Sequence, residues 1–200
     1  MTAPWLPLLD WWFGSAESPS ETAKAKGRLW FGKKKSQDTD AQHRFGGLVE
    51  QALAGGLAEW AETPPGWLAL VLLLDQLPRM IYRDTPKAYA GDARALQLVQ
   101  HGLKLQRDQA LSPLQRTFLY LVLEHSEHLA DQDEAVNRFT ALLPLMPSTD
   151  REHFTQSLDY AKKHQAVIQR FGRFPHRNEV LGRVSTEEEV VFLQQRGSRF

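Results

Sequence analysis

The chain has 200 residues, of which 42% are hydrophobic and 24% are charged, and its formal net charge is zero. This composition is ordinary for a globular protein with one core or two small ones. The balanced charge argues against nonspecific binding to nucleic acids or to membrane surfaces. There is no cysteine, which excludes disulfides and thiol catalysis.

The sequence shows no signal peptide, because a basic start followed by an apolar run is missing. The longest apolar run, residues 67–74, is far shorter than the ~20 residues that span a bilayer. We therefore expect a soluble, cytoplasmic protein with no membrane partner.

The N-terminal part predicts little regular structure. Residues 5–13 predict one or two helical turns. Residues 14–36 are rich in Ser, Gly and Lys, and we interpret them as a loop from which Trp30 and Phe31 pack back onto the protein.

From residue 38 onward, apolar side chains recur at spacings of three and four, which is typical of amphipathic helices. Ser, Thr and Pro stand where helix N-termini favour them. Helices are expected to begin near Asp38 or Asp40, Pro64, Thr85, Ser112, Asp131, Ser148 and Ser185. The first should reach Trp60, and Ser185 should form a capping box with Glu188.

Residues 67–74 are apolar on every side, which predicts a central, buried helix. Asp75 follows directly, and a lone buried charge is costly. We therefore expect its carboxylate to pair with an arginine, either Arg79 or one from residues 170–183. Arg83 lies one further turn along if the helix continues that far.

The fold class follows from these patterns. No useful stretch alternates with a period of two, so no strand is expected. The sequence predicts an all-α array of about seven or eight helices, with mostly antiparallel neighbours, in a single domain over residues 1–200.

Residues 170–178 combine three arginines, a histidine and two phenylalanines just after the expected long helix. Gly172 should end that helix, and Pro175 cannot continue it. One interpretation is that Phe171 and Phe174 fill the core while the arginines bind helix-end carbonyls. The other is that this turn carries a functional site.

Several sequence blocks together match a known family pattern: residues 73–79, 124–127, 170–178 and 181–183, with Ser185, Thr186, Glu188 and Glu189. Residues 11–14 and 90–92 match it more loosely. Together the blocks resemble the bacterial "domain of unknown function 924" family over nearly the whole chain. The resemblance implies a tetratricopeptide-like helical superhelix and no established activity. Val122 and His128 depart from the family pattern, so they are not counted as site residues.

Polar side chains in these blocks are the candidate ligand-binding residues: Asp75, Gln76, Arg79, Arg83, Glu127, Arg170, Arg173, Arg177, Asn178 and Arg183. The acidic and basic blocks are complementary, so they could simply form a network that braces the helices. Alternatively, surplus arginines hold a phosphate or carboxylate ligand. Convergence of Arg79, Arg173 and Arg177 on a concave pocket would favour the second interpretation, with Arg173 expected to be essential for anion binding.

General acid-base chemistry has weak candidates in Glu124, His125, His164 and His176, although no spacing demands it. No metal or cofactor is expected, since the metal-ligand spacings are missing and arginines on the same turns would repel a cation. Nucleic acid is not expected as a partner either.

Two functional hypotheses therefore stand. The first is a pocket for a small anionic ligand. The second is a tetratricopeptide-like interaction module, without catalysis, that grips an acidic peptide segment. An open groove lined by apolar side chains would favour the second.

Overall fold

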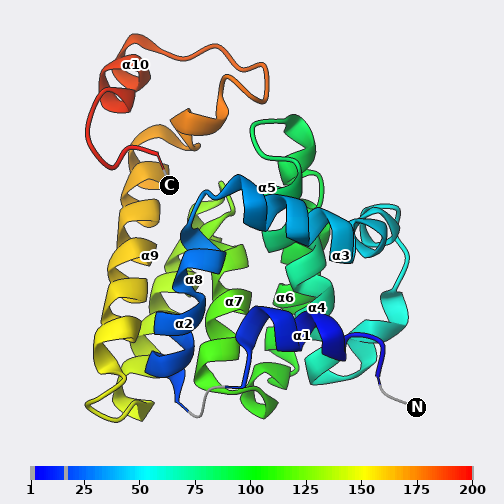
Figure 1. Cartoon of the computed structure of the whole chain (residues 1–200). Coiled ribbons are helices and arrows are strands. Elements are labelled where there is room, and N and C mark those ends of the chain that lie inside the picture. Colours follow the sequence, from blue (N-terminus) through cyan, green and yellow to red (C-terminus); the bar gives the residue numbers. More distant parts are fainter. Residues whose placement is uncertain (1–2, 16–17, 200) are drawn as a thin grey trace.

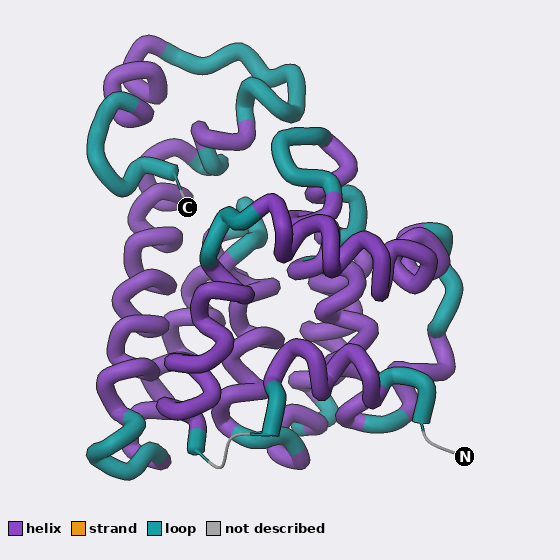
Figure 2. Tube along the Cα trace, viewed as in Figure 1, coloured by secondary structure: helices purple, strands orange, loops and turns teal. Residues whose placement is uncertain are grey.

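The computed structural model describes residues 3–15 and 18–199, and within these ranges the chain is helical without any strand (Figure 1, Figure 2). The expected all-α fold is confirmed. The α-helices are α1 (Leu6–Phe13), α2 (Pro19–Phe31), α3 (Lys35–Leu53), α4 (Pro64–Leu74), α5 (Gln76–Ile81), α6 (Asp92–Lys104), α7 (Pro113–Glu124), α8 (Leu129–Leu142), α9 (Arg151–Phe171) and α10 (Glu187–Leu193).

Short 3₁₀ helices connect them at Ala58–Glu62, Pro86–Tyr89, Arg107–Ala110, Leu143–Leu145 and Pro175–Arg177. The helix number is close to the expected seven or eight, and the additional helices are α2 and α5. None of the helices in the described ranges is both long and apolar enough to cross a membrane.

Helix α4 lies at the centre of the array, as its sequence predicts. The Thr63 hydroxyl caps it by accepting the Gly66 N–H, and every residue from Gly66 to Leu74 is buried. Helices α3, α6 and α7 pack against α4, while α8 packs on α7 and α9 packs on α8. Helix α10 and its flanking loops extend past the C-terminal end of α9 (Figure 1).

The expectation of a loop over residues 14–36 was wrong for most of that segment. Helix α2 begins after Ser18, whose hydroxyl accepts the Glu21 N–H. Trp30 does pack back, and its indole N–H donates to the Trp12 carbonyl at 3.0 Å. Phe31 does not, because it is 63% exposed. Residues 16–17 of this segment lie outside the described ranges.

Two further helix boundaries differ from the expected ones. Helix α3 ends before reaching Trp60, which lies in a separate 3₁₀ helix. Pro86 opens only a 3₁₀ turn, and α6 begins at Asp92. In both places the apolar spacing continues across a break in the backbone, so spacing alone cannot locate the break.

The capping box of α10 lies one residue beyond the expected pair. The Thr186 hydroxyl accepts the Glu189 N–H at 3.2 Å, and the Glu189 carboxylate accepts the Thr186 N–H at 2.8 Å. The shift has a physical cause: Glu189 also binds Arg173, which fixes its position.

Gly91 allows the start of α6 to approach α4 closely. A Cβ atom there would lie 2.1 Å from the Leu74 carbonyl oxygen, which is backbone and cannot easily move. We expect Gly91→Ala to lower the free energy of unfolding by about 2 kcal/mol through overpacking. Urea denaturation checks this.

The matched control is Gly47→Ala. Gly47 is exposed on α3, and a Cβ there would meet nothing within 4 Å. Alanine should therefore stabilise the helix by about 0.5 kcal/mol. Equal stability of the Gly91→Ala and Gly47→Ala proteins would contradict the close approach.

Candidate functional site

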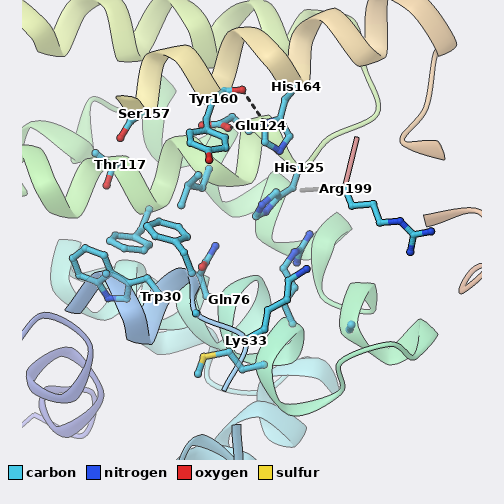
Figure 3. Close-up of a pocket in the computed structure, with 18 of the residues that line it drawn as sticks. Trp30, Lys33, Gln76, Thr117, Glu124, His125, Ser157, Tyr160, His164 and Arg199 are labelled. Atoms are coloured by element: carbon cyan, nitrogen blue, oxygen red, sulfur yellow. Dashed lines mark hydrogen bonds and ion pairs between the residues drawn. The ribbon is translucent and has the colours of Figure 1, made fainter. Parts of the chain in front are cut away.

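A cavity of about 840 Å³ lies between α2, α5, α7, α9 and the segment after α9 (Figure 3). Its lining includes four of the candidate ligand-binding residues, namely Gln76, Arg79, Arg83 and Arg177. The lining also includes all four weak catalytic candidates, namely Glu124, His125, His164 and His176. These groups come from four separate segments of the sequence, and the fold brings them to one place.

Most of the arginines singled out in the sequence are held by carboxylates. Arg79 pairs with Asp75 and Asp92, Arg83 with Asp38, Arg170 with Glu188, Arg173 with Glu189, and Arg183 with Glu127. For these five, the interpretation as a bracing network agrees with the geometry. Arg173 does not converge with Arg79 and Arg177 on the cavity.

Asp75 is fully buried behind the cavity wall, and its expected pairing with an arginine is confirmed. Its carboxylate lies 3.1 Å from Arg79 Nη1 and 2.7 Å from His125 Nδ1, and it accepts a hydrogen bond from Gln76 Nε2 at 2.7 Å. Burial acts to raise the pKa of Asp75, but Arg79 and His125 outweigh it and hold the pKa below its usual value. Asp75 is therefore ionised at neutral pH.

Arg79 has its donors well occupied. Its guanidinium donates to both carboxylate oxygens of Asp92, at 2.8 and 3.0 Å, and to the Asp75 carbonyl at 2.8 Å. Such bidentate pairs are strong and geometrically fixed. Arg79 is thus committed to bracing α5 against α6.

Arg177 differs from the other arginines of the cluster. It is only 6% exposed, and Nη1 donates to the His125 carbonyl at 2.9 Å. Nη1 lies 3.7 Å from an Asp92 oxygen, which already bonds Arg79. Within the described ranges, Nε has no hydrogen-bond partner. Arg177 is therefore a buried arginine of the lining whose hydrogen-bond donors are incompletely satisfied.

Aromatic rings hold the Arg177 side chain in place. The guanidinium carbon lies 4.4 Å from the centre of the Phe174 ring and 5.1 Å from that of Tyr89. These cation–π contacts stabilise the charge but satisfy no N–H donor. Burial, reinforced by the nearby charge of Arg79, lowers the pKa of Arg177 to about 10, so it stays cationic at neutral pH.

His125 is arranged as a neutral base. Since the Asp75 carboxylate can only accept, Nδ1 carries the proton and donates to it, which leaves the lone pair on Nε2. Burial and the Arg79 charge lower the pKa of His125 from its ordinary value. The ring points into the cavity (Figure 3).

His164 and His176 are also neutral. Burial lowers the pKa of each to about 3, with nearby positive charges contributing. His164 Nδ1 donates to the Tyr160 carbonyl at 2.9 Å. At neutral pH the cationic groups of this part of the cavity are therefore arginine and lysine side chains, not histidines.

Glu124 is buried at the cavity wall with 0% exposure. Neither carboxyl oxygen has a hydrogen-bond partner among the described residues, although one lies 3.2 Å from His164 Nδ1. Burial, and then the charge of Asp75, raises the pKa of Glu124 well above its ordinary value. The 3.2 Å contact is therefore between neutral groups and is not an ion pair.

This leads to a prediction for Glu124→Gln. A carboxyl group whose pKa is raised by folding contributes stability below its unfolded pKa, and that stability is lost as the pH rises through the folded pKa. The glutamine protein should match the wild type in acid and exceed it by about 1 kcal/mol or more in alkali. Urea denaturation from about pH 4 to about pH 9 measures this. Parallel stability curves for the two proteins would contradict a neutral Glu124.

The remaining candidates fix the loop that carries Arg177. Glu127 accepts the Phe174 N–H at 2.8 Å and pairs with Arg183 at 2.7 Å. The Asn178 amide donates to Glu189, which also holds Arg173. The residues outside the cavity are therefore braces, and they determine where Arg177 lies.

Some lining residues carried no clear signal in the sequence. Lys33 belongs to a lysine run whose sequence indicates only a solvated surface, and Arg199 lies outside the sequence blocks. Both nevertheless add a positive charge to the lining. Tyr89 contacts two arginines, and only its apolar spacing was visible in the sequence. In the described part of the chain, no group of three or more His, Asp or Glu side chains is placed to hold a metal ion.

Comparisons with known proteins agree with this helical fold. A comparison with curated proteins found no match. The structure is similar to that of a protein of unknown function, ATU0120 from Agrobacterium tumefaciens, with a TM-score of 0.74 and 36% sequence identity. The similarity covers 86% of this chain and 91% of that one. The model of the family described as "Bacterial protein of unknown function (DUF924)" matches residues 8–197. The chain therefore belongs to the DUF924 family.

Proposed function

We propose that the cavity binds a small ligand through an anionic group, a phosphate or a carboxylate. The observation that supports this most directly is Arg177, a buried cation of the cavity lining whose ion pair with Asp92, at 3.7 Å, is longer than a hydrogen bond. Burying a charge without complete pairing is costly. An anion bound beside the guanidinium would offset that cost through its negative charge.

Electrostatics also favour an anion. Lys33 and Arg199 are exposed cations of the lining, against one exposed carboxylate, Asp84. Glu124 is the buried carboxyl of the lining, and because it is neutral it does not repel a negative ligand. The neutral His125 and His164 can supply further hydrogen bonds.

The test is the melting temperature in phosphate against chloride at matched ionic strength, since exposed ion pairs respond to any salt. A ligand that binds the native state stabilises it by about 2.7 kcal/mol at a hundred times its dissociation constant. We expect phosphate to raise the melting temperature of the wild type. Arg177→Met, which keeps the side-chain length and removes the charge, should lose most of that rise.

Arg170→Ala is the matched control. Arg170 belongs to the same turn but pairs with Glu188 at the surface, 48% exposed, so this variant should keep the phosphate effect. Arg173→Ala should keep it too, because Arg173 pairs with Glu189 outside the cavity. An unchanged melting temperature in phosphate, and in a panel of small carboxylates, would refute the proposal.

The second proposal is an interaction module that grips an acidic peptide segment. It is supported by apolar side chains exposed around α10: Val184 is 88% exposed, Val190 47% and Val191 58%. The same measurement separates the two proposals. An acidic peptide that stabilises the protein while phosphate and small carboxylates do not would favour the interaction module.

A further inference from the structure

Resting on the proposed anion site, we propose that the ligand is amphiphilic: an anionic head beside Arg177 and an apolar body that extends along α7 towards Trp30. The geometry that carries this is a cavity in which the wall made by α2 and α7 is apolar near Trp30 and polar near Arg177. A site for free phosphate needs only the polar end.

Helix α7 marks out the length of the cavity. Its lining residues follow one helical face from Phe118 through Leu121 to Glu124. His125 follows directly and its carbonyl binds Arg177. The seven steps from Phe118 to His125 correspond to about 10 Å along a helix axis. The apolar side chains come first along this face, and the polar ones come last.

Helix α9 lines the cavity with side chains that carry polar groups along its whole length there. Its lining residues are His153, Gln156, Ser157, Tyr160 and His164. Figure 3 shows Ser157, with Thr117 and Trp30, on one side of the cavity, and His164 with His125 on the other. The change from apolar to polar side chains therefore lies along α7, while α9 supplies polar groups at both ends of the cavity.

The hydroxyl groups of Thr117 and Ser157 add little polarity to the end of the cavity near Trp30. The Thr117 hydroxyl donates to the Leu114 carbonyl at 2.6 Å, and the Ser157 hydroxyl donates to the His153 carbonyl at 3.1 Å. With these donors already used, α2 and α7 offer mainly carbon surface near Trp30, while His153 and Gln156 add polar groups on the α9 side.

An aromatic cluster makes this apolar end rigid. The Trp30 and Phe118 rings meet edge to face with centroids 4.9 Å apart, and Trp12 and Phe13 pack against both. A preformed apolar wall costs little to organise when an apolar body binds it. The volume of about 840 Å³ is within the range of ligand-binding pockets.

Straight-chain carboxylates of increasing length test the proposal on the intact protein, at concentrations below their aggregation threshold. Binding is measured by calorimetry, beside inorganic phosphate and alcohols and amines of equal chain length. Affinity should rise about fourfold for each methylene that enters the apolar end. Alcohols and amines should bind far more weakly than carboxylates of the same length.

Leu121→Asn places a polar group midway along the apolar wall. It should flatten the dependence on chain length while leaving phosphate binding unchanged. The matched control is Leu145→Asn, since Leu145 is a 61% exposed leucine outside the cavity lining. If Leu121→Asn does not fold, Leu121→Ala shortens the same wall and should weaken the longer carboxylates selectively.

The outcomes separate this inference from the proposed function. If phosphate and all carboxylates bind equally well regardless of length, the amphiphilic ligand is refuted and the anion site stands. If alcohols and amines bind as tightly as carboxylates and phosphate does not bind, the anion site is refuted, and this inference with it. A chain-length dependence that Leu121→Asn flattens, with Arg177→Met weakening every carboxylate, supports both.

Discussion

Asp75→Ala is expected to lower the free energy of unfolding by about 3 kcal/mol, because it removes the negative partner from a buried, charged cluster. Arg79 keeps its bidentate bond to Asp92, so it is not left without a partner. The stability is lost mainly because His125 and Gln76, which each donate a hydrogen bond to Asp75 at 2.7 Å, are left without that acceptor. Denaturant unfolding at neutral pH measures the effect.

The pH dependence gives this prediction a second readout. The pKa of Asp75 is held below its unfolded value, so its contribution to stability is present above the unfolded pKa, about 3.9 for aspartate, and is lost as the pH falls below it. The stability difference between wild type and Asp75→Ala should therefore shrink in acid.

Asp75→Asn is the matched control, since it keeps the shape and one acceptor oxygen while removing the charge. Its stability should lie between those of the wild type and the alanine protein. A wild-type melting temperature for Asp75→Ala at neutral pH would show that the cluster contributes little to folding.

The helices that could be predicted are those whose signals are local. The Ser112 capping box, Pro113 at the first position of α7 and the left-handed Gly172 after α9 each depend on a few adjacent residues. The all-apolar run of α4 predicts a buried helix regardless of which elements pack around it. By contrast, α2 buries only Thr22 and Trp30, which is too sparse a stripe to show helical periodicity.

The sequence indicated which residue types form the candidate site, but it did not indicate which carboxylate each arginine binds. Charges in a sequence do not specify partners: Arg83 binds Asp38, 45 residues earlier in the chain, although its helical spacing had suggested the neighbourhood of Asp75. The sequence also could not distinguish Arg173 from Arg177. They lie four positions apart, yet Arg173 pairs with Glu189 outside the cavity and Arg177 points into the protein beside His125.

The histidines and Glu124 come together for a reason that only the three-dimensional packing supplies. Helix α7 ends at Glu124, and α9 passes that end at the level of His164. The turn after α9 then folds back, and its Arg177 donates to the carbonyl of His125, the C-cap residue of α7. One of the sequence-based interpretations, arginines bound to helix-end carbonyls, therefore describes a contact of the very residue that we propose as the anion-binding cation.

Phe174→Ala is expected to have the largest effect on stability, about 4 kcal/mol, through loss of a fully buried aromatic side chain. Phe174 forms a small core with Val167 and Ile168, separate from the main one. Its ring also lies against the Arg177 guanidinium. The variant should therefore lose stability and lose the stabilisation by phosphate together.

Phe171→Ala is the neighbouring control, because Phe171 is only partly buried and contacts Phe192 rather than the cavity. It should cost less than half as much and should keep the phosphate effect. Phe174→Leu separates the two roles of the ring: it restores most of the apolar volume but has no aromatic face for Arg177. We expect it to recover most of the stability measured by denaturant unfolding while binding phosphate more weakly than the wild type. If Phe174→Leu binds phosphate as tightly as the wild type, the aromatic contact does not position Arg177, and the hydrogen bond to the His125 carbonyl must hold the guanidinium by itself.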